Sequence, residues 1–393
     1  MAERSEHMRL LFFSDIVWEH LYQRPQHLAS RLAGGGPLLW IEPATLGTPR
    51  RWRPEKKATD LYLLTLPQFP HNARTRGIRL ASKVLSSIPP LRWVLTLVQS
   101  ALLKRACRTL GIDPAASAAF VENFQFAPLI ARISPAAVVF DYIDDAFGFV
   151  DIPAYVRDDW RRMIRLADRI TVTAGVLQKQ IARETTTPVT IVENGVNTAA
   201  YAGTAPRPAD LPADGRPVVM YVGTISHWFD LALMDALLQA VPDVNVVLVG
   251  PVHPDCADRL NASRKFANLH VLGARAHADI PAYLAAARVG IIPFIRNPLT
   301  EAVNPVKLYE YTAAGIPVVS TAFSDDLEKL RHIAFIARSG EEFLAQVRAA
   351  LARGPDVPDG ARLRAFAREN DWQARATAIG AEIGAALDAR RTR

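Results

Sequence analysis

Short apolar runs alternate with helical segments along almost the whole chain, and this alternation constrains the fold more than any other feature. In the first half, the predicted strands are 10–14, 37–41, 61–66, 118–121, 137–142, 170–173 and 190–192. Apolar runs of this kind, bounded by turn residues, are typical of strands buried on both faces of a parallel sheet. The first half is therefore predicted to be an α/β unit.

The second half repeats the pattern. Strands are predicted at 218–222, 244–249, 269–272, 289–294, 317–320 and 333–337, with helices at 231–240, 256–263, 280–287, 306–314 and 341–352. This spacing indicates βαβ units with right-handed crossovers. A length of 393 residues suits two such domains. The boundary is expected near Asn194-Gly195, and residues 202–217, rich in Pro, Gly, Ala and Asp, are predicted to be a linker.

Composition excludes several classes of protein. Half of the residues are hydrophobic and 22% are charged, which excludes a disordered chain. Cys107 and Cys256 lie far apart without a Cys-x-x-Cys pattern, so neither a disulfide framework nor a structural zinc site is expected. The apolar stretch Leu10–Phe13 is too short for a signal peptide, and no run is long enough to span a membrane. A cytoplasmic protein is expected.

The common phosphate-binding loops are missing from the sequence. The segment after the first predicted strand, Ser14–Trp18, contains no glycine, so the G-x-G-x-x-G fingerprint of nicotinamide dehydrogenases fails. The P-loop pattern of nucleoside triphosphatases does not occur either. Gly34–Gly36 follows a predicted helix and precedes a strand, which favours a helix stop and turn.

A different anion site is predicted after the strand at 289–294. Asn304 is a strong N-cap candidate and Pro305 suits the first helical position. A helix beginning there would present free backbone N–H groups to a diphosphate. Lys307 would add a positive charge, and Glu310, on the same face, could accept hydrogen bonds from sugar hydroxyls. The alternative for Lys307 and Glu310 is an i,i+3 surface ion pair.

Several motifs resemble one family. They are Trp18 with QRPQHLA at 23–29, FDYIDD at 140–145, ENGVN at 193–197, YVG at 221–223, NPVKLYEYTAAGIPVVS at 304–320 and NDW at 370–372. Together they resemble the group 1, family-4-like bacterial glycosyltransferases of cell-surface polysaccharide synthesis. The likeness extends from residue 10 to about residue 380. It implies the GT-B fold: two doubly wound parallel-sheet Rossmann-like domains facing each other across a cleft.

The resemblance implies a donor site in the second domain. Glu310 would bind the donor ribose, while Lys307 and the backbone of Asn304, Pro305 and Val306 would hold the diphosphate. Gly223 and Thr224 would lie against the donor.

The sequence departs from the family in two places. The first glutamate of the Glu-x7-Glu motif is replaced by Ala302, and the adjacent Glu301 could take its role only with a one-residue shift. The Arg and Lys usual after Gly223 are also missing. Diphosphate binding must therefore depend on Lys307, with His227 or Arg296 as further candidates.

Transfer also needs a group that accepts the proton of the acceptor hydroxyl. Asp144 and Asp145 follow the strand at 137–142, and crowding is expected to raise the pKa of one of them. Helix or loop capping is the alternative role for this pair. Asp15, His20 and Arg24 follow the first strand and are candidates for contact with donor or acceptor. In a retaining mechanism the donor phosphate would replace the protein base. No D-x-D motif is present, so metal-independent catalysis without a cofactor is expected.

The segment 74–108 combines positive charge with apolar residues. Residues 61–112 contain no acidic residue, and the basic ones are Arg74, Arg76, Arg79, Lys83, Arg92, Lys104, Arg105 and Arg108. Such segments dock on anionic membrane surfaces. The alternative is helices that pack their apolar side inward. Nucleic-acid binding is disfavoured because no recognised motif accompanies the charge.

The sequence thus predicts a glycosyltransferase that moves a sugar from a UDP- or GDP-sugar to a glycan or lipid-linked acceptor in surface polysaccharide synthesis. An acceptor-side domain is expected at 1–195, a donor-binding domain at 196–370, and at 371–393 a helix that crosses back to the first domain. Docking on the inner face of the cell membrane is part of this hypothesis. A sugar-nucleotide 2-epimerase and a non-catalytic partner in an assembly complex remain the alternatives.

Overall fold

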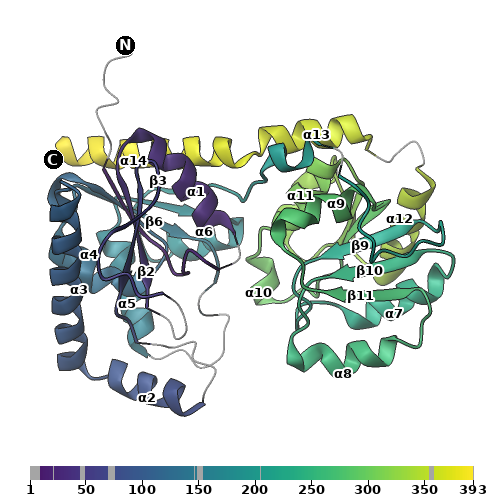
Figure 1. Cartoon of the computed structure of the whole chain (residues 1–393), viewed down its shortest axis with the longest axis horizontal. Helices are drawn as coiled ribbons and strands as arrows, with labels where there is room; N and C mark the ends of the chain where they lie inside the picture. Colours follow the sequence, from purple (N-terminus) through teal and green to yellow (C-terminus); the bar gives the residue numbers. More distant parts are fainter. Residues whose placement is uncertain are drawn as a thin grey trace. The chain divides into compact units, whose positions relative to one another are not determined.

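The computed structural model describes residues 9–20, 22–44, 49–69, 76–145, 147, 154–203, 205–353 and 358–392. The chain forms two units: the first contains residues 1–193 and 375–393, and the second contains residues 194–374. Each unit has one mainly parallel sheet covered by helices (Figure 1). Arg74 of the predicted basic segment lies outside the described residues, as do the side chains of Arg76 and Arg79.

The sheet of the first unit is centred on β1 (Leu10–Phe13), which lies between β2 (Leu38–Pro43) and β5 (Ala118–Val121). The other strands are β3 (Glu55–Ala58), β4 (Leu61–Leu66), β6 (Ala137–Tyr142), β7 (Arg169–Val172) and β8 (Val189–Ile191). Their order is β3-β4-β2-β1-β5-β6-β7-β8. The chain leaves β1 in one direction and returns on its other side at β5, so the carboxyl ends of β1 and β5 border a topological switch point.

The edge strand β3 was not predicted. It pairs antiparallel with β4, and all four of its residues, Glu-Lys-Lys-Ala, are exposed. A charged edge strand lacks the apolar run by which the other strands are recognised. Its exposed lysines discourage pairing of the sheet edge with another chain.

The helices of the first unit are α1 (Arg24–Leu32), α2 (Arg76–Ser86), α3 (Pro89–Thr109), α4 (Ala127–Ile133), α5 (Ala154–Leu166), α6 (Gly175–Ala182) and most of α14 (Trp372–Arg391). Helices α3, α4 and α5 pack beside one another. Thr190 donates a hydrogen bond to Glu382 at 2.9 Å, and Arg390 pairs with Asp168 at 2.8 Å. These contacts attach residues 375–393 to the first unit.

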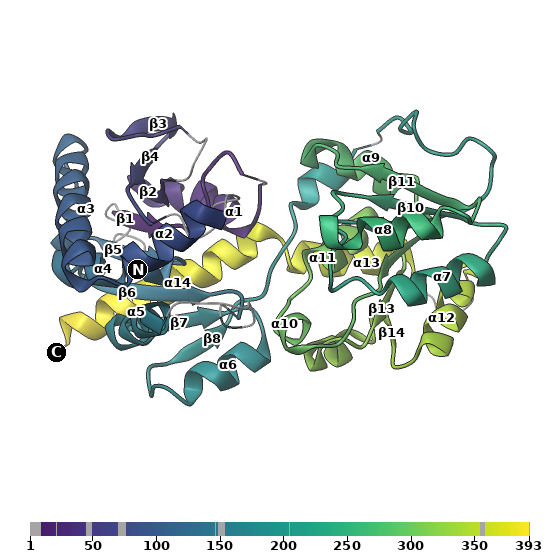
Figure 2. The same cartoon turned by 90° about the horizontal axis from the view of Figure 1, so that it is seen from below.

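The sheet of the second unit is centred on β9 (Val218–Val222), which lies between β10 (Asn245–Val249) and β12 (Val289–Ile292). The remaining strands are β11 (Leu269–Gly273), β13 (Val318–Thr321) and β14 (Phe335–Ala337), in the order β11-β10-β9-β12-β13-β14. The helices are α7 (Leu231–Ala240), α8 (Pro254–Ser263), α9 (Ile280–Ala285), α10 (Pro298–Glu301), α11 (Val306–Ala314), α12 (Gly340–Ala352) and α13 (Gly360–Glu369). Helices α9, α11 and α13 form one group and α7, α8 and α12 another (Figure 2).

The segment predicted to be a linker is instead part of the second unit. Leu211 is buried in its core. Asp210 pairs with Arg275 and accepts a hydrogen bond from the hydroxyl of Tyr283 at 2.9 Å. Its Pro-rich composition reflects an irregular backbone, which these side chains nevertheless hold against the sheet.

Helix α11 is attached to the carboxyl end of β9 through Tyr311. The backbone N–H of Val222 donates to the Tyr311 hydroxyl at 2.9 Å. The Tyr311 ring lies so close to β12 that a Cβ at Gly290 would overlap it. A glycine on β12 therefore allows α11 to approach the sheet, and this approach sets the position of the helix start beside β9.

Candidate functional site

The side chain of Lys307 lies across Gly223, at the point where β9 ends. A Cβ at Gly223 would overlap Lys307 Cε and lie 2.7 Å from its Nζ. Gly223 also has φ +138°, a backbone conformation that other residues rarely adopt. Gly250, after β10, has φ +149°, and a Cβ there would overlap the Gly223 carbonyl. The two glycines let the backbone and Lys307 come together at this edge of the sheet.

Two aromatic rings and a carboxylate surround the Lys307 ammonium. Its Nζ lies 5.5 Å from the ring centre of Tyr221 and 5.3 Å from that of Phe294, which is cation–π geometry. Burial lowers the pKa of Lys307, and the nearby Glu310 opposes this shift. The ammonium is thus held in place without a direct ion pair among the described residues, and it is available to an anion.

Helix α11 spans the predicted range, but its N-cap is Pro305 rather than Asn304. The Asn304 side chain accepts a hydrogen bond from the Asn194 N–H at 2.9 Å and donates one to the Tyr309 hydroxyl at 3.2 Å. Its amide therefore holds Asn194 instead of capping the helix. The backbone N–H groups of Val306 and Lys307 have no acceptor within the described part of the chain, which leaves them free for an anion, as predicted for this helix start.

Glu310 lies on the next turn of α11 and is buried. Its Oε1 is 3.6 Å from His277 Nε2. Burial raises the pKa of Glu310, while His277 and Lys307 lower it. The hydroxyl of Tyr201 is buried and has no hydrogen-bond partner among the described residues, and burial followed by the charge of Glu310 raises its pKa. Glu310 and Tyr201 are thus buried polar groups with spare hydrogen-bonding capacity, suited to hydroxyls of a ligand.

Tyr201 and His277 were missed by the sequence analysis. They lie 109 and 33 positions before Glu310, in short 3₁₀ helices that carry no recognisable motif. Only the folded chain brings them to α11, so no local sequence signal identifies them.

The remaining predicted donor residues have other partners or none. The Thr224 carbonyl accepts a hydrogen bond from the Tyr221 hydroxyl at 2.8 Å, and His227 is exposed. Glu301 pairs with Arg296 at 2.8 Å, and Arg296 also binds Asp325 at 2.7 Å. Within the described residues, no contact joins Glu301 to Lys307 or Glu310. The geometry does not favour a catalytic role for Glu301.

In the first unit, acidic residues follow β1, β5 and β6 at one edge of the sheet. Asp145, after β6, accepts hydrogen bonds from the Tyr142 hydroxyl at 3.3 Å and the Phe147 N–H at 3.0 Å, which matches the capping alternative. Asp144 makes no such bond in the described structure and its side chain reaches solvent. Partial burial and then Asp15 raise the pKa of Asp144 to about 7.

Arg24 has a structural position rather than an open one. It is buried, and its guanidinium binds Asp141 through two hydrogen bonds of 2.9 and 3.1 Å. It also donates to the Glu193 carbonyl at 3.0 Å. The prediction that Arg24 contacts a substrate is therefore not favoured, because its donors are taken up in joining α1 to β6 and to the chain at Glu193.

Asp15 and His20 lie on the loop after β1 and are exposed. Although the Asp15 side chain reaches solvent, partial burial of its carboxyl raises its pKa, and its own backbone N–H and His20 oppose the shift. The loop is held by Glu42 of β2, which accepts hydrogen bonds from the Trp18 N–H at 2.8 Å and from Arg51 at 2.9 Å. Glu42 thus positions the loop that carries Asp15 and His20.

Glu122 is a functional candidate that the sequence analysis missed. It follows β5 at the switch point, is buried, and neither of its carboxyl oxygens has a hydrogen-bond partner in the described structure. Burial, followed by Asp141 and Asp15, raises the pKa of Glu122 well above its usual range, while Arg24 and Ser14 partly oppose this. The shift favours the protonated form of Glu122, which can donate a hydrogen bond.

The raised pKa of Glu122 predicts a specific pH dependence of stability. The folded state keeps this proton to a higher pH than the unfolded state, so the contribution to the free energy of unfolding falls as pH rises from about 4.5 toward the folded pKa. Glu122→Gln keeps the size and shape of the side chain but removes the group that titrates. Its stability relative to wild type should therefore increase with pH in this window, by up to about 1.4 kcal/mol per pH unit.

Denaturant unfolding between pH 4 and 8 measures this difference. Glu184→Gln, an exposed glutamate of the same unit, is the control and should show a difference from wild type that hardly changes with pH. A constant difference for Glu122→Gln would contradict the buried neutral acid.

Two further observations concern metals and membranes. No group of three or more His, Cys, Asp and Glu side chains is arranged to hold a metal ion in the described ranges. Among the described helices, none is both long and apolar enough to cross a membrane.

Comparison with protein families finds a match for most of the second unit. Residues 216–353 match the family described as glycosyl transferases group 1. TuaH of Bacillus subtilis, whose name assigns it to teichuronic acid biosynthesis, is 26% identical over 219 residues, covering 54% of this chain and 55% of that protein. The UDP-glucuronate:glycolipid 2-beta-glucuronosyltransferase of Xanthomonas campestris is 24% identical over 267 residues, covering 66% and 60%. The chain thus spans little more than half the length of these relatives.

Solved structures show the same architecture. Sucrose-phosphate synthase of Thermosynechococcus elongatus has a TM-score of 0.69 at 16% identity, covering 95% of this chain and 98% of that one. HepE of Anabaena, solved with UDP and glucose, has a TM-score of 0.67 at 16% identity, covering 96% and 100%. The predicted GT-B fold and the resemblance to bacterial group 1 glycosyltransferases are confirmed.

Proposed function

Because this chain has the GT-B fold and resembles bacterial group 1 glycosyltransferases, we propose that it transfers a sugar from a UDP-sugar to a glycan or lipid-linked acceptor in surface polysaccharide synthesis. The match of residues 216–353 to that family supports the activity. The names of two relatives, which mention teichuronic acid and a glycolipid, support the acceptor class. UDP is favoured because HepE was solved with UDP and one relative uses UDP-glucuronate.

One observation carries the donor site: Lys307 lies across Gly223, next to the free N–H groups at the start of α11. An ammonium and a helix N-terminus at the same point attract a diphosphate and stabilise it as a leaving group. Glu310, with Tyr201 near it, supplies buried polar groups for the donor's hydroxyls. The ribose and the diphosphate would then bind on successive turns of one helix.

The donor site is tested by UDP binding. Lys307→Met keeps the aliphatic stem over Gly223 but removes the charge, and it should weaken UDP about 10- to 100-fold because a charge-assisted hydrogen bond contributes about 1.5–3 kcal/mol. Titration calorimetry measures the dissociation constant. Lys265→Met, an exposed lysine of the same unit, is the control and should bind UDP like wild type. Equal affinity of both variants would refute the donor site.

For the proton of the acceptor hydroxyl, we assign Asp144 as the base. Its neighbour Asp145 is already bound in a local turn, whereas Asp144 reaches solvent. A base with a pKa near the working pH is efficient. A pKa raised to about 7 places Asp144 in that range. This assignment implies direct displacement with inversion at the sugar carbon.

The pH dependence of transfer tests this base. The carboxylate must be deprotonated, so kcat/KM should rise with pH and level off above an apparent pKa of about 7. Asp144→Asn should lower kcat/KM by about 10²- to 10⁴-fold, whereas Asp145→Asn, the matched control, should lose much less. An unchanged rate in Asp144→Asn would exclude this role, while UDP binding would remain a separate measure of the donor site.

A membrane-docking face supports a lipid-linked acceptor. Of the twelve large hydrophobic side chains exposed in the described part of the chain, eight lie between residues 80 and 98: Leu80, Val84, Leu85, Ile88, Leu91, Trp93, Val94 and Val98. Leu91, Val94 and Val98 follow the spacing i, i+3, i+7 and form one exposed stripe of α3. Basic residues of α3, including Lys104 and Arg105, are also exposed. Apolar side chains among basic ones are typical of helices that lie on anionic membranes.

Binding to lipid vesicles tests this face. Val94→Ser with Val98→Ser removes apolar area from the stripe and should weaken binding to vesicles of phosphatidylcholine and phosphatidylglycerol about ten-fold. Co-sedimentation measures the bound fraction. Val176→Ser, an exposed valine on α6, should bind like wild type. Equal binding by all three proteins would exclude the stripe as the docking face.

A further inference from the structure

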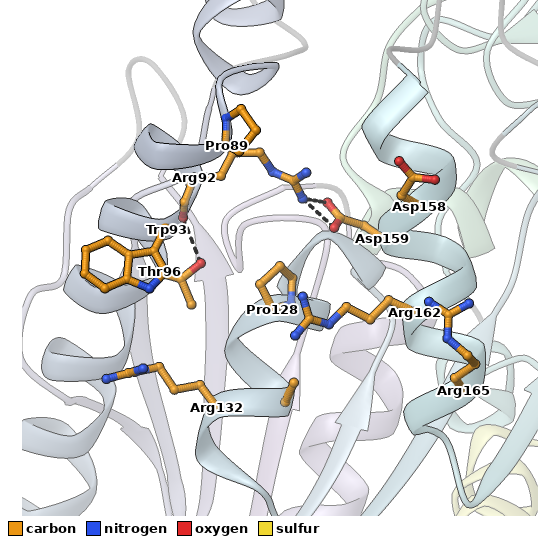
Figure 3. Close-up of a pocket in the computed structure, with 11 residues that line it drawn as sticks. Pro89, Arg92, Trp93, Thr96, Pro128, Arg132, Asp158, Asp159, Arg162 and Arg165 are labelled. Atoms are coloured by element: carbon orange, nitrogen blue, oxygen red, sulfur yellow. Dashed lines mark hydrogen bonds and ion pairs between the residues drawn. The ribbon is translucent and has the colours of Figure 1, made fainter.

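A groove of about 710 Å³ lies between α3, α4 and α5 of the first unit, and none of its lining residues belongs to the predicted donor or acceptor sites (Figure 3). This volume is in the range of small-molecule sites. Four arginines line it: Arg92 of α3, Arg132 of α4, and Arg162 and Arg165 of α5. Guanidinium groups spaced around one groove repel one another, and an anion bound between them would relieve this repulsion.

Among the described residues, only Arg92 of these arginines forms an ion pair, although the charge of Arg162 also acts on Asp159 and lowers its pKa. Arg92 forms an ion pair with both oxygens of Asp159, which is buried. Arg132, Arg162 and Arg165 have no ion pair or hydrogen bond to any described residue, and all three side chains are exposed. Arg162 extends from α5 toward Pro128 at the start of α4 (Figure 3). With Asp158 as the remaining carboxylate, the lining carries a net charge of about two positive units.

The Arg92–Asp159 pair shapes the groove. It connects α3 to α5, and the Arg92 guanidinium also lies over the Tyr155 ring, 4.5 Å from its centre. On α3, the groove is lined by Pro89, Arg92, Trp93 and Thr96, at the spacing i, i+3, i+4, i+7. This is the side of the helix opposite the exposed stripe formed by Leu91, Val94 and Val98.

Because the groove and the stripe lie on opposite sides of α3, the depth of the groove relative to the lipid headgroups follows from how deeply the stripe is buried in a membrane. An interfacial helix buries its apolar face about 5–10 Å into the boundary between headgroups and acyl chains. A helix with its side chains is about 10–12 Å across. When the stripe is buried, the groove behind α3 therefore lies at the level of the lipid headgroups. Trp93, 62% exposed at the groove, is a residue type enriched at this level.

We propose that this groove binds the phosphate of an anionic phospholipid headgroup. Arg162, Arg165 and Arg132 would hold the phosphate oxygens, since guanidinium groups bind phosphate through paired hydrogen bonds. The Arg92–Asp159 ion pair would fix the spacing of α3 and α5, the helices on two sides of the groove. This inference rests on the docking face described under the proposed function and adds a specific lipid partner to it. Diffuse attraction to a charged surface would need no such groove.

The experiment compares two anionic vesicles of equal surface charge. One contains phosphatidylcholine with phosphatidylglycerol, and the other contains phosphatidylcholine with oleate, whose charge is a carboxylate. Wild-type protein should prefer the first. Arg162→Gln with Arg165→Gln should lose this preference and bind phosphatidylglycerol vesicles at least about ten-fold more weakly. Arg105→Gln with Arg108→Gln, exposed on α3 outside the groove, should weaken binding to both vesicles equally and keep the preference.

Several outcomes are informative. A wild-type protein without preference, or a groove variant that retains it, would overturn the proposal. Calorimetric binding of glycerol phosphate to wild type, with unchanged vesicle binding by the groove variant, would show a soluble phosphate ligand and also overturn it. UDP binding should be the same in wild type and both double variants. If UDP fails to bind while the lipid preference is confirmed, the proposed activity is wrong and the headgroup site stands.

Discussion

The contact of Lys307 with Gly223 is the constraint on which the proposed donor site depends. It requires a residue without a side chain at the end of β9 and a helix start held close to that strand. The hydrogen bond between Val222 and Tyr311, with Gly290 beneath the tyrosine ring, supplies the second condition. The ammonium, the free N–H groups of α11 and the buried Glu310 come together because these packing conditions are met.

The two units use the same architectural position for different chemistry. In both, the groups of interest follow strands beside a topological switch point, where ligands bind in open α/β sheets. In the second unit this edge carries a cation and free N–H groups, which suit a diphosphate. In the first it carries Asp15, Glu122 and Asp144, whose pKa values are all raised by burial, with neighbouring carboxylates adding to the shift at Glu122 and Asp144. Acidic groups with raised pKa values suit proton transfer and hydrogen bonding to hydroxyls.

Among the described residues of the first unit, buried charged side chains are paired, with one exception. Asp141 is paired with Arg24, and Glu42 receives hydrogen bonds from Trp18 and Arg51. Such buried carboxylates are satisfied, as is usual in folded proteins. Glu122 is the exception, because both of its oxygens are without partners in the described structure. An unsatisfied buried acid beside the switch point is costly to keep, and function is the usual reason for such a cost.

The sequence by itself determined the α/β class, most of the strands and helix α11, since these follow from apolar periodicity and one continuous motif. It also pointed to Lys307 and Glu310 as candidates for donor binding. It did not reveal that Asn304 binds Asn194, that Arg24 is taken up by Asp141, or that Tyr201, His277 and Glu122 lie where they do. Those facts depend on contacts between residues far apart in the chain, which the periodicity of a sequence does not reveal. Tertiary structure also decided that the arginines of α3, α4 and α5 line one groove, because only packing determines which faces of separate helices meet.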